Sequence, residues 1–393
     1  MPRMGLSAAM LCALAATSSA LAAPGCPFCP PTQPTFSEQL AESDAACLVK
    51  WVSVSETKSG DEIGSATTTF EVVEPVRTGN GKLSPGTKIT VDFLRMGRPG
   101  ELFVLFGKTE ETGIGWSAPV EVAEDSFQYI RQAPALEVPP EKRLKYFLKF
   151  LETSDSVIAN DAFAEFSRAK YEDMAQLAAT FPREKLRRWL ESPETSKVRL
   201  GFYGLLLGLC GNDDDANFLA EQIFAPVAPD DVRLGIDGMM GGYLLLTRSA
   251  GLQRLVDGKM RDPETPSTDL FAVLNALRFT WEYCRDRLPA AELRQALELF
   301  LDRSEFAELV LPDLARWKDW SVLDRLISQY GQDPFDYDAA KLKIIQFAQA
   351  CAKDKSTEGM TPEHVTAAKM FLARVESESP NLIRQTRLNS PLR

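Results

Sequence analysis

The stretch "VRLGFYGLLLG" at residues 198–208 returns as "VRLGIDGMMGG" at residues 232–242, an offset of 34 residues. The two copies share a Val-Arg-Leu start and three glycines at equivalent positions. A fainter third copy keeps small residues at Ala272 and Ala276, another 34 residues along the chain. A repeat of this length is typical of stacked helix pairs, and small residues three or four apart let neighbouring helices approach closely. The repeat therefore predicts a stack of helices.

The sequence around the repeat keeps a helical period. In "EKRLKYFLKFLE", residues 141–152, Leu144 and Phe147 fall on one face of a helix. We therefore expect an all-α repeat domain over residues 143–376. The chain ends in "NLIRQTRLNSPLR", which has three arginines and no acidic residue, and this pattern predicts a basic, solvated tail over residues 377–393.

The sequence before residue 137 has the pattern of β-strands. "CLVKWVSVSE" at 47–56 alternates apolar and polar residues, and "GELFVLFG" at 100–107 is a short apolar run suited to a buried strand. Turns rich in Gly, Asn and Pro separate these runs. Several short strands at this spacing predict a small closed β-barrel over residues 23–136. The paired prolines that follow mark a stiff linker at 137–142.

The start of the chain and its charge bear on compartment and partners. Residues 1–22 have Arg3 before an apolar stretch and end in "ALA", as a cleavable signal peptide does. We expect an exported protein, periplasmic or extracellular, with no membrane span after cleavage. The net charge is −11, and acidic residues outnumber basic ones in both the strand-rich and the helical part. This charge disfavours nucleic acid as a partner.

The motif "PGCPFCPP" at 24–31 places Cys26 and Cys29 two residues apart. Such a pair is a redox dithiol, half of a metal site or a structural disulfide. A redox dithiol opens a helix, which the following prolines prevent. Export to an oxidising compartment favours a disulfide to Cys47, from Cys26 or from Cys29, that closes a loop of about 20 residues. The remaining cysteine is then a free thiol, unless Cys26 and Cys29 bond to each other.

Other candidate chemistry is sparse. The single histidine, His364, excludes catalytic or metal sites that need two histidines. The acidic run "GNDDDANFL" at 211–219 lacks the spacing of a calcium loop and is better suited to capping a helix. We expect no metal and no cofactor. Aromatic residues gather between 281 and 337 and form either the core or a concave binding face. The candidates for that face are Trp281, Tyr283, Trp317, Trp320 and Tyr330.

Two family resemblances add to this interpretation. The stretch "SPETSKVRLGFYGLLLGLCGNDDDANFLAEQI", 192–223, resembles a HEAT-type helical repeat, and the likeness covers about 141–330. The early cysteine, "SDAACLVKWVSV" at 43–54 and the strand "GELFVLFG" resemble a netrin-like or tissue-inhibitor-of-metalloproteinase-like OB barrel. Those domains begin Cys-x-Cys, whereas this chain has Cys-x-x-Cys. The combination also resembles uncharacterised secreted bacterial proteins with HEAT repeats.

Together these patterns predict an α+β multidomain protein: a β-barrel followed by a HEAT-like α-solenoid. We expect a non-enzymatic binding or scaffold protein whose partner is a protein or another component of the cell envelope. The alternative is a secreted enzyme that carries out thiol–disulfide chemistry at the Cys-Pro-Phe-Cys motif.

Overall fold

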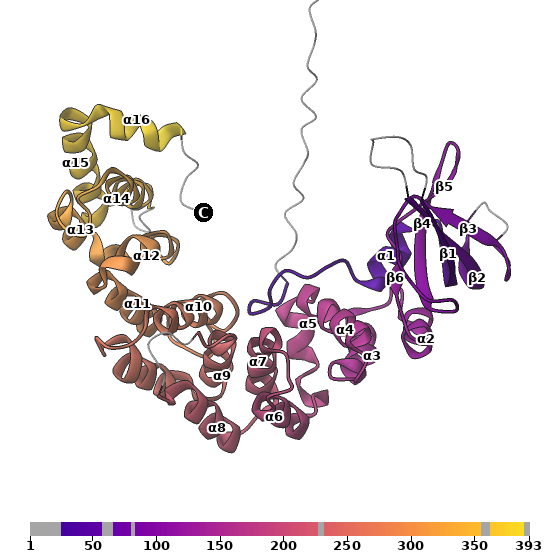
Figure 1. The fold of residues 1–393 in the computed structure, drawn as a ribbon. Coiled ribbons are helices and arrows are strands. Elements are labelled where there is room, and N and C mark those ends of the chain that lie inside the picture. Colours follow the sequence, from indigo (N-terminus) through magenta and orange to yellow (C-terminus); the bar gives the residue numbers. More distant parts are fainter. Residues whose placement is uncertain (1–24, 57–65, 80–82, 227–231, 355–361, 389–393) are drawn as a thin grey trace, which may run out of the picture.

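The chain forms an open arc, with a β-sheet at one end and helices along the rest (Figure 1). The structure is a computed structural model, and it describes residues 25–56, 66–79, 83–226, 232–354 and 362–388. The predicted signal peptide, 1–22, lies outside the described residues.

Within these residues, six strands form one antiparallel sheet. The strands are β1 (Ala45–Glu56), β2 (Ala66–Thr78), β3 (Lys88–Val91), β4 (Leu102–Glu110), β5 (Gly113–Trp116) and β6 (Val120–Glu121). Their order is β3-β2-β1-β4-β5, and β6 pairs with β4. The strands expected at 47–56 and 100–107 are confirmed as parts of β1 and β4, which pair directly through residues such as Leu48 and Val104.

Successive side chains along a strand point to opposite faces of the sheet. Both faces of this sheet are buried. Ala46 and Leu48 of β1 join a large core shared with the helices, whereas Cys47 and Val49 join a smaller core on the opposite face. The smaller core takes side chains from β1 to β5. Beyond β1 its members include Phe70, Val72, Ile89, Val91, Phe103, Leu105 and Trp116. The end strands β3 and β5 therefore cover the same interior, and the sheet is curled. Hydrogen-bonded pairing between these two end strands is not found in the described residues.

Helices make up most of the remaining chain. The helices next to the sheet are α1 (Phe36–Glu42), α2 (Glu124–Gln132), α3 (Pro140–Phe147), α4 (Ser156–Arg168), α5 (Tyr171–Gln176) and α6 (Arg183–Glu191). The middle of the arc holds α7 (Leu200–Cys210), α8 (Asp213–Phe224), α9 (Ile236–Leu255), α10 (Ser267–Tyr283) and α11 (Ala290–Glu298). The far end holds α12 (Ser304–Arg316), α13 (Leu323–Gln329), α14 (Asp338–Cys351), α15 (Glu363–Glu378) and α16 (Pro380–Leu388).

The repeated glycines lie where α7 packs on α9. A Cβ added to Gly204 would lie 2.7 Å from the backbone N and Cα of Met239. A Cβ added to Gly208 would lie 2.2 Å from the Cα of Gly242. The two helix backbones therefore touch with no side chain between them. The close helix approach expected from the repeat is confirmed.

Four helices, α7, α9, α10 and α12, run in the same direction, and we call them the inner helices. Between α9 and α10, Asn275 donates a hydrogen bond to Asp237 at 3.3 Å, and four residues further along both helices the ring of Phe279 lies beside Gly241. Between α10 and α12, Ser267 contacts Glu305 near the starts, and Trp281 stacks on Trp317 near the ends. These contacts join positions 36 to 38 residues apart. Stacked helical units with a nearly constant spacing follow from this register.

Three boundaries differ from the sequence-based prediction. Residues expected to continue the strands form α2, because Glu124 and Asp125 favour a helix start and Phe127 and Ile130 bury one face. The linker is short, because Pro140 is already the first residue of α3, a position that suits proline.

The third difference is the C-terminal tail. Residues 377 and 378 end α15, residues 380–388 form α16, and α16 packs on α14 and α15 instead of being solvated. Ile383 is buried, and Gln349 donates a hydrogen bond to Thr386 at 2.8 Å. The apolar side chain of Ile383 anchors a segment whose arginines had suggested a free tail.

Candidate functional site

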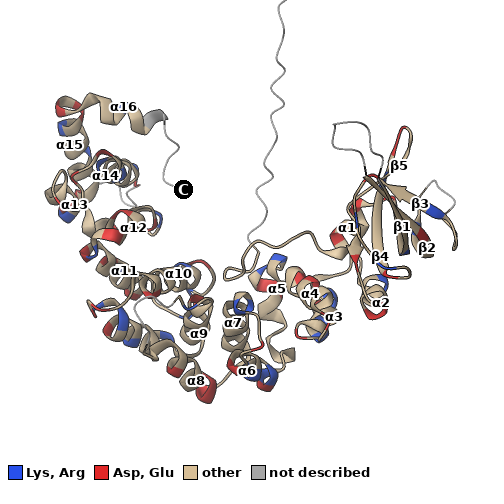
Figure 2. Cartoon of the chain, in the orientation of Figure 1, with Lys and Arg blue, Asp and Glu red and all other residues tan. Residues whose placement is uncertain are grey.

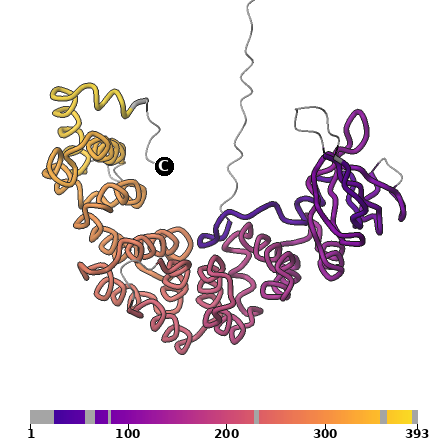
Figure 3. Tube along the Cα trace, viewed as in Figure 1, coloured from indigo at the N-terminus to yellow at the C-terminus, as the bar shows by residue number. Residues whose placement is uncertain are grey.

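Residues 25–35, which we call the strap, run from the sheet end across the inner side of the arc (Figure 3). The tip of the strap is a small loop closed by a Cys26–Cys29 disulfide. The backbone N–H of Cys26 donates to the carbonyl oxygen of Ser167 at 2.9 Å. The strap therefore returns from the sheet to the end of α4 and is fixed there.

Phe28, at the tip, inserts between three inner helices. Its ring centroid lies 4.9 Å from that of Phe279 on α10. Its ring also fills the space beside Gly241 on α9, where a Cβ would lie 2.6 Å away, and its carbonyl oxygen lies beside Gly201 on α7. Phe28 is buried. The Phe28 side chain thus anchors the tip of the strap between α7, α9 and α10.

The expected disulfide to Cys47 is not formed, and this expectation was wrong. Cys47 is a free thiol inside the smaller core of the curled sheet, fully buried. Cys26 belongs to the large core on the other side of the sheet. The period-two alternation of β1 turns Cys47 away from the face on which the strap lies, so the two sulfurs cannot meet. Burial raises the pKa of the Cys47 thiol to about 12.

Arg168 holds the middle of the strap. Its guanidinium donates to the backbone carbonyl oxygens of Thr32 and Gln33, at 3.2 and 2.8 Å, and forms an ion pair with Glu38 of α1. Prolines at 30, 31 and 34 leave this segment few N–H donors of its own. Arg168 therefore holds the strap on α4 by donating hydrogen bonds to the backbone carbonyl oxygens of the strap.

A cleft of about 820 Å³ opens between the strap, the sheet and α4. We call it the strap cleft. Its walls are mainly apolar and come from the strap prolines, from Val120 of the sheet, and from Val157, Phe163 and Val198 of the helical part. Polar side chains, among them Gln39 and Asp161, lie between these apolar walls. A concave, mostly apolar cleft with a few polar groups at a junction between parts is the usual form of a binding site.

Asp161 is the buried acid of the strap cleft. One carboxylate oxygen accepts a hydrogen bond from the backbone N–H of Phe36 and the other accepts one from the Tyr129 hydroxyl, both at 2.7 Å. Burial raises the pKa of Asp161 to about 7. Because both oxygens are already bonded to α1 and α2, Asp161 joins three elements at the cleft wall.

Glu165 follows one turn later on α4 and is also buried. It forms an ion pair with Arg143 of α3, and burial raises its pKa. Neither Asp161 nor Glu165 was predicted as a site residue from the sequence. The available signal was their i, i+4 spacing on a face of α4 that is otherwise built from Ala and Phe, such as Ala162 and Phe166.

The aromatic candidates are mainly packing residues. Trp281 and Trp317 stack at 4.3 Å between ring centroids and are buried, Trp317 with 1% exposure. Tyr283, Trp320 and Tyr330 are partly buried and pack against the same core. The five side chains thus stabilise the stacking of helices 10 to 15 and do not form one open face.

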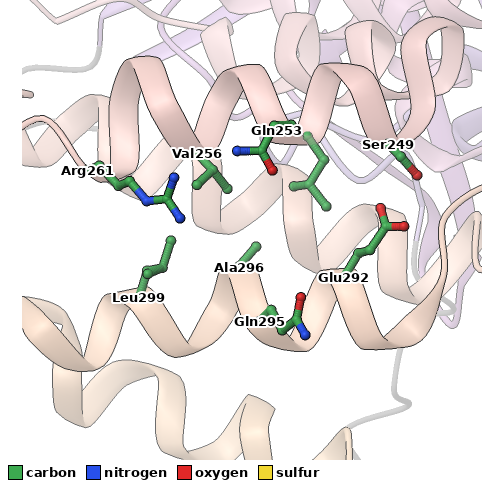
Figure 4. Close-up of a pocket in the computed structure, with 9 residues that line it drawn as sticks. Ser249, Gln253, Val256, Arg261, Glu292, Gln295, Ala296 and Leu299 are labelled. Atoms are coloured by element: carbon green, nitrogen blue, oxygen red, sulfur yellow. The ribbon is translucent and has the colours of Figure 1, made fainter.

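A second hollow, of about 500 Å³, lies between α9 and α11 (Figure 4). Gln253 of α9 and Val256 of the π-helical turn that follows it face Gln295 of α11 and Leu299, the residue just after α11, across the hollow. Its lining mixes charged, polar and apolar side chains without a shared direction, and none of the sequence candidates lies in it. The strap cleft is therefore the better candidate site.

The acidic run at 211–219 caps a helix. The side chain of Asn212 accepts from the backbone N–H groups of Asp214 and Asp215, and Asp215 accepts from the backbone N–H of Asn212 at 3.0 Å. The helix-capping interpretation is thus confirmed. Groups of three or more His, Cys, Asp or Glu that could hold a metal ion are absent from the described residues.

Charge and hydropathy add two facts about the described residues. Lys and Arg are interspersed with Asp and Glu along the helices of the arc (Figure 2). Each described helix is too short or too polar to cross a membrane.

Comparison of the chain with protein-family models, curated proteins and solved structures finds no match.

Proposed function

We propose that this is an exported binding or scaffold protein that uses the strap cleft to hold an apolar, extended segment of a protein or another cell-envelope component. The observation that carries the proposal is the cleft itself. Its volume of about 820 Å³ falls in the range of roughly 300–1,000 Å³ that ligand sites occupy. Its walls join the strap, the sheet and α4, as binding sites at junctions between parts commonly do.

The proposal includes the finer architecture. The sheet order β3-β2-β1-β4-β5 and the shared interior core support an OB-like or netrin-like barrel. The parallel inner helices, with their nearly constant register and touching glycines, support a HEAT-like solenoid. Both kinds of module recognise partners through surfaces rather than through a fixed catalytic group.

The geometry gives less support to thiol–disulfide chemistry. Cys26 and Cys29 lie in the turn at the tip of the strap, and the first helix after them starts at Phe36. The lowered thiol pKa of redox dithiols depends on a helix N-terminus at the motif. Cys26 is also buried against α4, with 7% exposure, so a substrate sulfur has little access to it.

Site-specific photocross-linking tests the proposal. A photoreactive amino acid is placed at Val157 or at Gln39, which line the strap cleft, and as a control at Met370, which is 69% exposed on α15. With the envelope fraction of the source cells, we expect the same discrete adduct from both cleft positions and none from position 370. A folded protein that gives no adduct at either cleft position would contradict the function.

A further inference from the structure

The hollow of about 500 Å³ between α9 and α11 plays no part in the proposed function, and we call it the α9–α11 hollow (Figure 4). Arg261 lies at one end of it, and Glu292 and Ser249 lie at the other end. The buried side chains of Val256 and Ala296 lie between these ends. The volume falls in the range of roughly 300–1,000 Å³ that small-molecule sites occupy. A cation and an anion at opposite ends fit a ligand with a carboxylate at one end and an ammonium group at the other.

The two charged side chains are available to a ligand. Glu292 is half-buried and makes no ion pair with another described residue. Arg261 is 60% exposed and forms an ion pair with Asp257. A guanidinium carries five N–H donors, so this ion pair leaves donors for a ligand carboxylate. Lys259, in the turn before Arg261, is buried on Asp269 of α10 and does not line the hollow, which makes Arg261 the cation of this end.

Two glutamine side chains line the hollow between its charged ends, one from each wall (Figure 4). Gln253 of α9 donates a hydrogen bond to Asp257 at 2.8 Å, and the side-chain amide of Gln295 on α11 has no partner among the described residues. A side-chain amide offers donors and an acceptor, which is also what a peptide unit offers. Glutamines on both walls therefore suit a ligand whose middle consists of peptide units.

The backbone of α9 departs from regular helix geometry at both ends of the hollow. Arg248, the residue before Ser249, has φ 55° and ψ −136°, a conformation in which a non-glycine residue is strained. Val256–Met260 forms a π-helical turn, which ends directly before Arg261. Strained residues and π-helical turns are both uncommon, and both occur frequently at functional sites. The two departures here flank the segment that forms one wall of the hollow.

The length of the hollow selects the size of the ligand. Leu299 lies beside Arg261 at one end, and Glu292 lies at the other end (Figure 4). Leu299 and Glu292 are seven positions apart in the chain, which corresponds to about 10 Å along a helix. An extended peptide advances about 3.3–3.6 Å per residue, so about three residues span the hollow. A single amino acid is too short to reach both ends.

We propose that the α9–α11 hollow binds short peptides of about three residues that have free termini. The terminal carboxylate pairs with Arg261, the terminal ammonium group pairs with Glu292, and Gln253 and Gln295 pair with the peptide units between them. Because these contacts are with the termini and the backbone, the hollow recognises the length of a peptide rather than its sequence. This site goes beyond the proposed function, since it shares no lining residue with the strap cleft.

Isothermal titration calorimetry on the full chain tests the inference with trialanine, N-acetyl-trialanine and trialanine amide. Because each blocked form loses one charge-assisted contact, we expect free trialanine to bind at least about tenfold more tightly than either of them. Free alanine should bind at least about tenfold more weakly than trialanine. Equal affinity of the free and blocked forms, or no binding of trialanine at about 10 mM, would overturn the inference.

Two substitutions assign the contacts. Arg261→Gln should remove the preference over the amide and keep the preference over the acetylated form, and Glu292→Gln should do the reverse. Arg98→Gln, which changes an exposed arginine of the sheet part, is the matched control and should leave both preferences unchanged. If both preferences survive in Arg261→Gln and in Glu292→Gln, the peptide binds elsewhere and the assignment is wrong.

Two further measurements separate this site from the strap cleft. Thermal melting followed by circular dichroism shows that each variant is folded, and the cross-links from Val157 and Gln39 should be the same in all of them. If trialanine does not bind while these cross-links persist, this inference alone fails. If trialanine binds while the cross-links are absent, the proposed function alone fails.

Discussion

Gly204→Ala tests the helix contact on which the repeat depends. Alanine is the better helix former by about 1 kcal/mol, so an isolated α7 would gain stability. In the folded chain, however, the new Cβ would lie 2.7 Å from the backbone N and Cα of Met239. Ordinary contact needs about 3.5–4.0 Å, so α7 and α9 would have to separate by about 1 Å.

The steric term should exceed the propensity term. Overpacking of a tight core costs about 1–3 kcal/mol, and here the obstacle is backbone that cannot rotate away. The separation would also loosen Tyr203 and Leu207, which are fully buried on α7. We expect Gly204→Ala to lower the free energy of unfolding by up to about 2 kcal/mol after the gain in propensity is subtracted.

Urea denaturation followed by tryptophan fluorescence measures the change. Trp189 lies 5.1 Å from Tyr203 between ring centroids, so its emission reports on the α7 region. Gly258→Ala is the matched control, because the atoms nearest its new Cβ, at 2.9 Å, belong to the ring of Phe224, a half-buried side chain that can move. An unfolding midpoint for Gly204→Ala at or above that of the unchanged protein, with the control unaffected, would refute the close-contact reasoning.

Three further predictions concern the strap and the sheet. Because burial raises the pKa of Asp161 to about 7, the folded chain binds this proton more tightly than the unfolded chain. Stability should therefore fall as pH rises from about 4 to about 7, and Asp161→Asn should remove that part of the slope, on the order of a few kcal/mol, in urea titrations at several pH values; parallel slopes in both proteins would argue against it. Phe28→Ala should remove about 3–5 kcal/mol of strap docking, seen as faster amide hydrogen exchange in residues 25–35 with little change in the far helices; unchanged exchange would show that Phe28 is not the anchor. Alkylation with mass-spectrometric readout should label Cys26 and Cys29 only after a reductant and Cys47 only after a denaturant, since Cys47 is fully buried with its pKa raised to about 12; native labelling of Cys47 would contradict its place in the curled sheet.

Local patterns in the sequence predicted the parts of the fold that depend on neighbours in the chain. The glycines at an offset of 34 predicted the α7–α9 contact, and the alternation in 47–56 predicted β1. Both signals come from the period of one element, which fixes the face that is buried.

Features that depend on distant contacts were not predictable in this way. The pairing of Cys26 depends on which side of β1 faces the strap, and the burial of Asp161 depends on the meeting of α1, α2 and α4. The strap cleft could not be inferred either, because its walls come from segments near residues 30, 120 and 160. The docking of α16 was missed because the arginines of the last stretch are conspicuous and its one buried anchor, Ile383, is not.

The position of Phe28 also sets an order of events during synthesis. Its partner Phe279 lies about 250 residues later in the chain. Closing a loop of that length costs conformational entropy, and the contacts with α9 and α10 that offset this cost form only after both helices have been synthesised. The N-terminal segment must therefore wait, undocked, while the sheet and the first helices form. On the export proposed above, with the N-terminus crossing the membrane first, Phe28 would dock only after α10 has crossed.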